Sequence, residues 1–357
     1  MVIEDLLREL SRKGGSDLHI SSALPPVIRV DGKLQRLDMD ALTSEDVETL
    51  LFPMMTSEQR RRLEQDWELD FSYGVEGLGR YRVNFYKDKG SYAAAFRTIA
   101  TVAPRLEDLG MPQIVTEIAE RPRGLCLVTG PTGSGKSTTL AAMIDYINRS
   151  RAEHILTIED PIEFVHTSKT SVIHQRELGM DTRSFANALK SALREDPDII
   201  LVGEMRDHET ISLALTAAET GHLVFGTLHT SSASQTIDRI IDVFPEGQQQ
   251  QIRVQLANSL IAVFAQTLLP KRQPDGSKKG RVMAQEIMVV TPAIANLIRE
   301  SKAAQIYSTL QTSSSAGMQT LESALAQLYR SGKITMDDAM LKTSKPTELK
   351  RLIQGVK

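Results

Sequence analysis

The chain has 357 residues, 41% of them hydrophobic, and at roughly 150 residues per domain this length indicates two domains, or three. Its 42 Lys and Arg residues against 45 Asp and Glu residues give a net charge of -3, without the basic surplus that proteins binding nucleic acid usually carry, so we expect no nucleic acid partner. The single cysteine, Cys126, excludes an internal disulfide and any multi-cysteine metal site, and it fits a cytoplasmic protein.

The start of the chain shows no targeting or membrane-spanning pattern. Met1 to Asp5 have no basic region ahead of an apolar stretch, and no later apolar run approaches the ~18 residues that a membrane span needs. Any membrane association is therefore expected to depend on a partner protein.

The first hundred residues predict a small α+β domain with an antiparallel sheet. An apolar stripe at helical spacing predicts an amphipathic helix over residues 1–13. Asp31-Gly32 separates two β-prone runs and is typical of a hairpin turn, and a meander of strands is expected over about 69–99. Thr43 and Thr56 are expected to cap two short helices between these strands.

Residues 101–112 are expected to link two domains, because they contain prolines and a glycine and show little periodicity. Residues 1–100 then form the N-terminal domain and residues 113–357 the second domain. In the second, apolar strand-like runs alternate with helical stretches, which indicates an α/β fold with a parallel sheet covered on both faces. The segment from Lys271 to Arg281 is rich in Lys, Arg, Gly and Pro, and its simplest interpretation is a solvated loop.

Gly130 to Ser137 fits the phosphate-binding loop pattern G-x-x-x-x-G-K-[ST], between an apolar strand and a helix-forming run. In such a loop, backbone N–H groups surround the β-phosphate, the lysine reaches the β- and γ-phosphates and the hydroxyl of Ser137 ligates Mg²⁺. The guanine-reading N-K-x-D signature is absent, so we expect ATP and Mg²⁺. The predicted nucleotide-binding residues are Gly130, Pro131, Thr132, Gly133, Ser134, Gly135, Lys136, Ser137 and Thr138.

Two other predicted strands end in carboxylates. The apolar run before Gly203 ends at Glu204, and the run from Ile155 to Ile158 leads into Glu159 and Glu163. Ligands of α/β sheets lie at the carboxyl ends of the strands, so one carboxylate is expected to orient or deprotonate the attacking water and the other to hold Mg²⁺ through water. For either carboxylate alone, a solvated charge or a helix cap is an equal alternative; together they favour a function.

The seven histidines are dispersed and form no tight ligand pair, so we expect no histidine-bound metal. His222 and His229 bracket one predicted strand, and an extended chain sets them ~23 Å apart, too far to share a metal. His229, at the carboxyl end, is expected to face the nucleotide and to contact its γ-phosphate.

Three arginines of the first domain are further candidates. Arg80 and Arg82 alternate with Tyr81 and Val83 and therefore project from one sheet face, and Arg97 lies near the end of a later strand. A solvated face is the simplest interpretation. A transferring phosphoryl group, however, is stabilised by an arginine that a neighbouring subunit supplies.

These motifs resemble the secretion ATPases of type IV pili and type II secretion systems, and within them the pilus-retraction branch. Thr157 to Glu163 resemble the Asp box of that family, Leu193 to Asp207 its Walker B segment, and Thr216 to Thr230 its His box. The resemblance covers nearly the whole chain.

The resemblance implies a PAS-like N-terminal domain, a RecA-like ATPase domain and a homohexameric ring with nucleotide between subunits. It implies that Glu163 is the general base, that Glu204 is the Walker B acid and that His229 contacts the γ-phosphate. It also makes Arg80, Arg82 and Arg97 candidates for reaching the neighbour's nucleotide. As a partner it implies a polytopic platform protein of the inner membrane, at which a cytoplasmic motor is peripherally located.

The retraction branch fits best because one cysteine cannot build the four-cysteine zinc site typical of extension and secretion members. Ala293 to Glu300 nearly match the late retraction hallmark A-I-R-N-L-I-R-E, with Ala295 in place of the arginine. We expect ATP hydrolysis to persist, with an effect of this change on coupling to pilus retraction. An accessory retraction paralogue, a pilus-extension ATPase and a type II secretion ATPase are the alternatives within the family.

Two alternatives from outside the family stay open. A RecA-like DNA motor shares the core architecture, although the net charge counts against it. A nucleotide-gated binding module would hold ATP without hydrolysis, and the paired carboxylates Glu163 and Glu204 argue against that reading.

Overall fold

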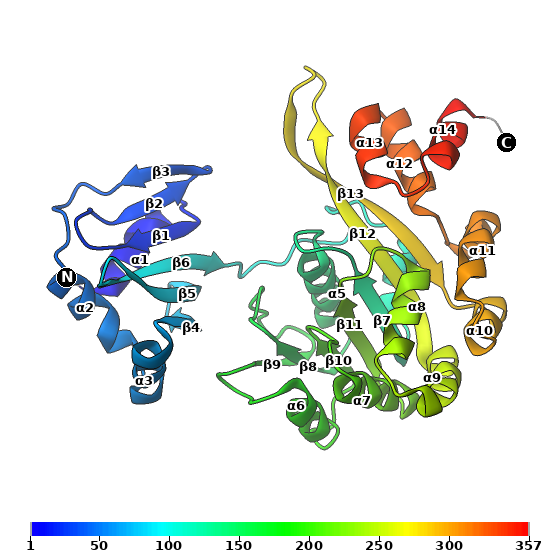
Figure 1. Cartoon of the computed structure of the whole chain (residues 1–357), viewed down its shortest axis with the longest axis horizontal. Helices are drawn as coiled ribbons and strands as arrows, with labels where there is room; N and C mark the ends of the chain where they lie inside the picture. The colour runs from blue at the N-terminus through cyan, green and yellow to red at the C-terminus, as the bar shows by residue number, and fades with distance from the viewer. Residues whose placement is uncertain (1, 356–357) are drawn as a thin grey trace. The chain divides into compact units, whose positions relative to one another are not determined.

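The computed structural model describes residues 2–355, which divide into two compact units (Figure 1). The first unit holds the residues up to Val102 together with Pro161–Val165 and Gly179–Asp181, and the second holds the rest. Within residues 2–355, no helix is long and apolar enough to cross a membrane.

The N-terminal unit contains a six-stranded antiparallel sheet in the order β3-β2-β1-β6-β5-β4. Its strands are β1 (Asp17–Ile20), β2 (Val27–Val30), β3 (Lys33–Arg36), β4 (Glu68–Val75), β5 (Gly79–Asp88) and β6 (Ser91–Ile99). The hairpin predicted at Asp31-Gly32 joins β2 to β3, and both turn residues have positive φ angles.

Three α-helices of this unit pack on the sheet around one apolar core. They are α1 (Ile3–Arg12), α2 (Ser44–Leu51), which η1 (Phe52–Met54) follows, and α3 (Ser57–Asp66). The predicted caps are confirmed, because the hydroxyls of Thr43 and Thr56 accept hydrogen bonds from the N–H groups of Asp46 and Gln59.

The second unit contains a seven-stranded sheet in the order β13-β12-β7-β11-β10-β8-β9. β13 pairs antiparallel with β12, and the other neighbouring pairs are parallel, as the continuous apolar runs predicted. The strands are β7 (Gly124–Thr129), β8 (His154–Glu159), β9 (Val172–Glu177), β10 (Ile199–Val202), β11 (Leu223–Leu228), β12 (Leu260–Arg272) and β13 (Lys278–Val289).

Helices cover both faces of this sheet. One apolar cluster joins the strands to α4 and α5, and another joins them to the helices from α6 to α11 on the opposite face. The α/β fold class is therefore confirmed. The helices are α4 (Gln113–Ala119), α5 (Lys136–Ser150), α6 (Phe185–Ala192), α7 (His208–Glu219), α8 (Ala233–Asp242), α9 (Glu246–Ser259), α10 (Pro292–Arg299), η2 (Ala303–Gln305) and α11 (Ile306–Thr312).

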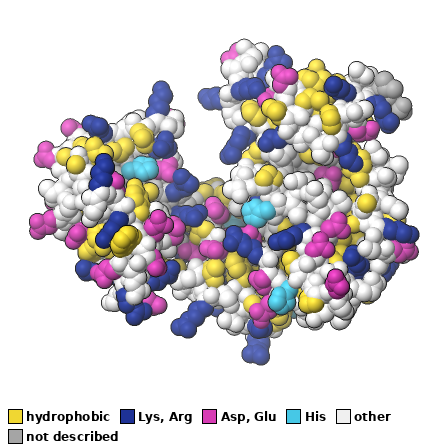
Figure 2. Space-filling model, viewed as in Figure 1, with side chains coloured by type: hydrophobic (Ala, Val, Ile, Leu, Met, Phe, Trp, Pro, Cys, Tyr) yellow, Lys and Arg dark blue, Asp and Glu magenta, His cyan; other side chains and the backbone are white. Residues whose placement is uncertain are grey.

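The interpretation of Lys271 to Arg281 as a loop is wrong for most of that segment. β12 and β13 continue their pairing to Arg272 and Lys278, and only a short turn separates them. Backbone hydrogen bonds pair these strand ends, and their charged side chains lie in solvent. The amino-acid composition of the segment therefore does not indicate that it forms strands. In Figure 1 the hairpin extends beyond the other strands, and in Figure 2 Lys and Arg side chains gather around this part of the surface.

The C-terminal helices pack beside the outer half of this hairpin around a small apolar core of their own. They are α12 (Leu321–Arg330), α13 (Met336–Lys342) and α14 (Pro346–Gln354), whereas η3 (Ser314–Ala316) packs through Ala316 against the cluster that α6 to α11 share with the sheet. Ala295, the departure from the retraction hallmark, lies on α10 and is buried in the core that α6 to α11 share with the sheet.

Candidate nucleotide site

A loop between β7 and α5 has the backbone that phosphate binding requires. Gly130, Gly133 and Gly135 have φ angles of 139°, 77° and 90°, which residues with a Cβ rarely adopt. Gly130 is also confined by packing, since an added Cβ would lie 2.3 Å from the carbonyl oxygen of Gln266. Because α5 begins at Lys136, the partial positive charge of its N-terminus faces this loop. The strand, loop and helix predicted here are therefore present.

The ammonium group of Lys136 lies over the loop. Its Nζ donates hydrogen bonds to the carbonyl oxygens of Gly130 at 2.8 Å and Pro131 at 3.2 Å. Partial burial lowers the pKa of Lys136, and the negative charge of Glu204 opposes that effect. Along the rest of the loop, Gly130 and Ser134 are buried, Gly135 and Thr138 are half-buried, and Pro131, Thr132, Gly133 and Ser137 are exposed.

Glu204 and His229 follow the ends of β10 and β11, and β11 lies between β10 and β7. The carboxyl ends of these parallel strands meet at the edge that carries the loop. His229 Nε2 and Arg206 Nε lie 3.0 Å and 2.6 Å from Oε1 of Glu204. Burial acts to raise the pKa of Glu204, but Arg206 and then His229 outweigh it, so the pKa lies below its usual value. Glu204 is therefore ionised at neutral pH.

The other predicted carboxylates lie at and after the end of β8. Oε1 of Glu159, the last residue of β8, accepts hydrogen bonds from Thr157 Oγ1 at 2.7 Å and Gln175 Nε2 at 3.1 Å. Glu163 is exposed and belongs to the segment Pro161–Val165, which groups with the N-terminal unit. A β-bridge from Ala100 to Phe164 connects that segment to this unit. The residues brought together at the loop edge are thus Lys136, Glu204 and His229.

A cavity of about 540 Å³ adjoins the start of α5. Gly135 and Thr138 form one side of it, and Leu268 and Met283 of the β12–β13 hairpin contribute apolar surface. The lining combines these apolar side chains with polar and charged groups, and the cavity lies beside the loop, so a small ligand could occupy it. Its charged lining residues are Glu107, Asp108, Lys271, Arg281 and Lys333.

The three candidate arginines lie on two paired strands of the N-terminal unit. Arg82 of β5 is exposed and is the register partner of Arg97 on β6, and Arg80 is half-buried on the same strand as Arg82. Arg97 Nε donates to Asp17 Oδ1 at 2.9 Å. Burial acts to raise the pKa of Asp17, but hydrogen bonds from Ser16 and Arg97 lower it below its usual value. Arg97 is therefore already engaged within its own unit.

The oxygen donors at the loop edge suit Mg²⁺. Ser137 offers a hydroxyl and Glu204 an ionised carboxylate, and Mg²⁺ binds such groups together with phosphates and water. Across residues 2–355, no group of three or more His, Cys, Asp and Glu side chains can hold a metal by itself. At the other end of β11 the ring of His222 contacts the carbonyl oxygen of Ala217, which is a structural role.

Two residues of the site were missed by sequence reasoning. Arg206 contacts Glu204, and its position two residues later was the available signal. Gln266 contacts the phosphate loop from β12, and no local pattern connects it with Ser134, from which 132 residues of sequence separate it.

Comparisons with known proteins give a consistent result. A family described as "Type II/IV secretion system protein" matches residues 1–341. The "Type IV pilus retractation ATPase PilT" of Pseudomonas aeruginosa is 54% identical over 346 residues, covering 97% of this chain and 99% of that protein. The "Type IV pilus ATPase PilU" of the same organism is 40% identical over 354 residues, covering 99% and 92%.

Solved structures agree with these relatives. The crystal structure of "the Pilus Retraction Motor PilT and Bound ADP" superposes with a TM-score of 0.90 at 49% identity, covering 98% of this chain and 99% of that one. The ATPase DotB of Legionella pneumophila superposes with a TM-score of 0.75 at 28% identity, covering 95% and 94%.

Proposed function

The chain belongs to the type II/IV secretion system protein family, and from that premise we propose that it is an ATP-hydrolysing motor that retracts type IV pili. The observation that carries the proposal is the convergence of the loop lysine Lys136, the ionised Glu204 and His229 at one edge of the parallel sheet. Relatives named for pilus retraction supply the biological direction.

The triphosphate of ATP binds along the loop in this proposal. The backbone N–H groups at the start of α5 surround the β-phosphate, and Lys136 exchanges its two carbonyl partners for phosphate oxygens. Ser137 would hold Mg²⁺ directly and Glu204 would hold it through water; when bound, the ion would neutralise charge on the transferring phosphoryl group. The ribose and base extend into the cavity beside Thr138.

Hydrolysis needs a base beside the attacking water and positive charge around the γ-phosphate. We assign Glu163 as the general base that accepts a proton from the attacking water, and His229 as the γ-phosphate contact. A neighbouring copy in a homohexamer would supply Arg80, Arg82 or Arg97 to the phosphates. Because Arg97 already pairs with Asp17, its use would require that ion pair to break, whereas Arg82 is exposed on the paired strand.

The mechanical partner in this proposal is a polytopic platform protein of the inner membrane, with the motor on its cytoplasmic side. Cyclic hydrolysis would change the subunit interfaces of the ring and turn that platform. Ala295 is the specific observation that favours a second candidate, an accessory retraction motor, because it replaces an arginine of the retraction hallmark.

The hydrolytic assignment is tested by Glu204→Ala. This variant should lose phosphate release from ATP while retaining binding of ATP, because the loop and Lys136 are unchanged. Undiminished turnover would contradict the assignment, and stimulation of turnover by DNA that declines steeply with salt would favour a DNA motor instead.

The direction of the motor is tested in cells. Deleting the gene and counting surface pili by electron microscopy, alongside surface motility, should give abundant pili and no motility. Loss of pili would indicate extension, and an unchanged count with reduced motility would indicate the accessory motor.

A further inference from the structure

Gln266, on β12, connects the sheet to the phosphate loop through side-chain hydrogen bonds. Its side chain is buried, with 3% exposed. Nε2 donates a hydrogen bond to the carbonyl oxygen of Ser134 at 3.0 Å, and Oε1 accepts one from Thr139 Oγ1 at 3.0 Å. One amide thus holds both the phosphate loop and the first turn of α5.

The orientation of this amide is fixed by its neighbours. The carbonyl oxygen of Ser134 can only accept, so the nitrogen end of Gln266 must face it. The oxygen end then faces two donors, Thr139 Oγ1 and Gln285 Nε2, the latter at 3.3 Å. Gln319 Nε2 in turn donates to the carbonyl oxygen of Gln285 at 2.9 Å. A buried network whose members satisfy one another restricts the position of the loop.

The consequence for the loop follows from peptide geometry. A trans peptide is planar, and its C=O and N–H point in opposite directions. Since Gln266 holds the carbonyl of Ser134 toward β12, the N–H of Gly135 in the same peptide points away from the sheet. The backbone of Gln266 also closes the space beside Gly130.

We propose that Gln266 is a positioning residue for the nucleotide, orienting the Ser134–Gly135 peptide so that the Gly135 N–H faces the β-phosphate. The inference rests on the proposed nucleotide site. It assigns Gln266 to the binding of every nucleotide that carries a β-phosphate, ADP as well as ATP. Thr139 and Gln285 act one step further away, by setting which end of the amide faces the loop.

The test is the pair Gln266→Glu and Gln266→Met. The first retains size and an acceptor for Thr139 but sets an oxygen against the Ser134 carbonyl; the second removes the amide without adding charge, in case a buried carboxylate impairs folding. We expect both to weaken binding of a fluorescent ADP analogue and of ATP by roughly tenfold, because the hydrogen bond from the Gly135 N–H to the charged β-phosphate is misaligned. KM for ATP should rise in parallel.

Two matched variants make the result decisive. Thr267→Val, on the adjacent position of β12, should bind both nucleotides as the unaltered protein does. Unchanged affinity in both Gln266 variants, or lower thermal stability without a change in affinity, would overturn the positioning role. Lys136→Ala separates the two levels: if it too binds nucleotide normally, the proposed site itself is wrong, whereas loss of binding in Lys136→Ala alone refutes only the role of Gln266.

Discussion

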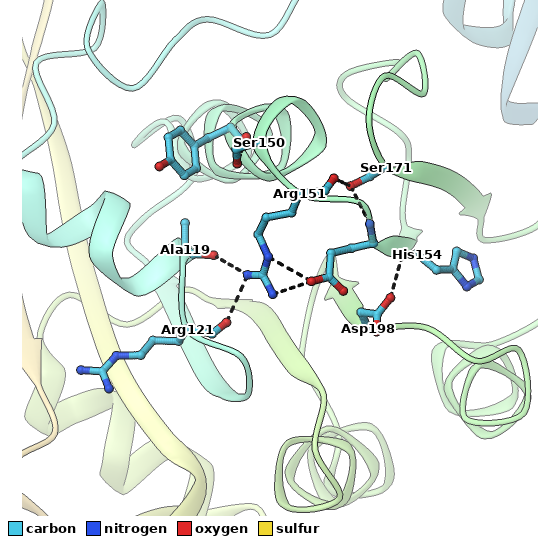
Figure 3. A network of polar contacts seen from close by, with 9 residues as sticks. Ala119, Arg121, Ser150, Arg151, His154, Ser171 and Asp198 are labelled. Atoms are coloured by element: carbon cyan, nitrogen blue, oxygen red, sulfur yellow. Dashed lines mark hydrogen bonds and ion pairs between the residues drawn. The ribbon is translucent and has the colours of Figure 1, made fainter.

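The polar groups at the two edges of the parallel sheet differ in the partners to which they are bonded. At the amino edge, the side chain of Arg151 donates to the carbonyl oxygens of Ala119 and Arg121 and pairs with Glu153 at 2.8 Å (Figure 3). Asp198 accepts the N–H of His154 at the same edge, as Figure 3 also shows.

At the carboxyl edge the polar groups have partners that a ligand can replace. The ammonium of Lys136 rests on two carbonyl oxygens of its own loop, and Oε1 of Glu204 receives both Arg206 and His229. The amino edge is thus a closed network of hydrogen bonds, and the carboxyl edge is a set of charged groups whose present partners a ligand could replace. One sheet thus carries a network that stabilises the fold at its amino edge and the candidate site at its carboxyl edge.

The largest effect should come from Lys136→Ala, which tests the carboxyl edge of the sheet directly. Without the ammonium, the β- and γ-phosphates lose their main counter-charge, and we expect ATP turnover to fall by roughly 100-fold or more. Steady-state phosphate release measures the loss. Urea denaturation should show nearly unchanged stability, since Lys136 bonds only to loop carbonyls; a large loss of stability would mean that this edge is structural too.

The sequence predicts those parts of the molecule whose signals are local. Apolar runs predicted the parallel sheet, and a spaced glycine and lysine pattern predicted the loop before α5; the α/β core and the family resemblance are both confirmed. The strand-end positions of Glu204 and His229 could be placed because parallel strands share one carboxyl edge. Their catalytic roles stay predictions.

The contacts that escaped prediction join distant segments. Gln266 meets Ser134 because β12 pairs with β7, and nothing near either residue specifies that pairing. The sequence predicts a loop for the strand ends around Lys271 and Arg281, because both their faces are solvated and their side chains show no alternation. The grouping of Pro161–Val165 with the N-terminal unit likewise depends on tertiary contacts.

A second prediction concerns Glu286, a buried carboxylate on β13. Its Oε1 accepts the N–H of Ala233, the first residue of α8, at 2.7 Å. Burial raises its pKa to about 7; the Ala233 hydrogen bond and Lys345 oppose this, and Glu322 adds to it. The folded state therefore holds a proton that the unfolded state releases between about pH 4.5 and 7, so this contribution to stability falls as pH rises through that range.

Glu286→Gln reproduces the protonated side chain and removes that dependence. At pH 8 the variant should be more stable than the unaltered protein by about 2–3 kcal/mol, and near pH 4.5 the two should be alike. Urea denaturation at both pH values measures the difference. An equal difference at the two pH values would show that the carboxyl group of Glu286 does not titrate in this range.

A third prediction tests the amino edge of the sheet through the variant Arg151→Met. The variant retains most of the apolar stem but leaves the carbonyl oxygens of Ala119 and Arg121 and the carboxylate of Glu153 without their donor. We expect a loss of about 2 kcal/mol in unfolding free energy, because partly buried acceptors lose their hydrogen bonds. Turnover per folded molecule should be unchanged. A fall in turnover comparable to that of Lys136→Ala would end the distinction between the edges.

The smallest effect should come from Arg206→Ala, and it appears only at acidic pH. Arg206 is the largest factor that lowers the pKa of Glu204, so its removal should raise that pKa toward the usual value. In the proposed mechanism Glu204 holds Mg²⁺ through water only when it is ionised, so the acid limb of the rate profile should move to higher pH. We expect a several-fold loss of turnover near pH 4 and little change at pH 8, with Arg206→Lys closer to the unaltered protein. A uniform loss across the profile would mean that Arg206 acts on the nucleotide itself and is one more cation that binds it.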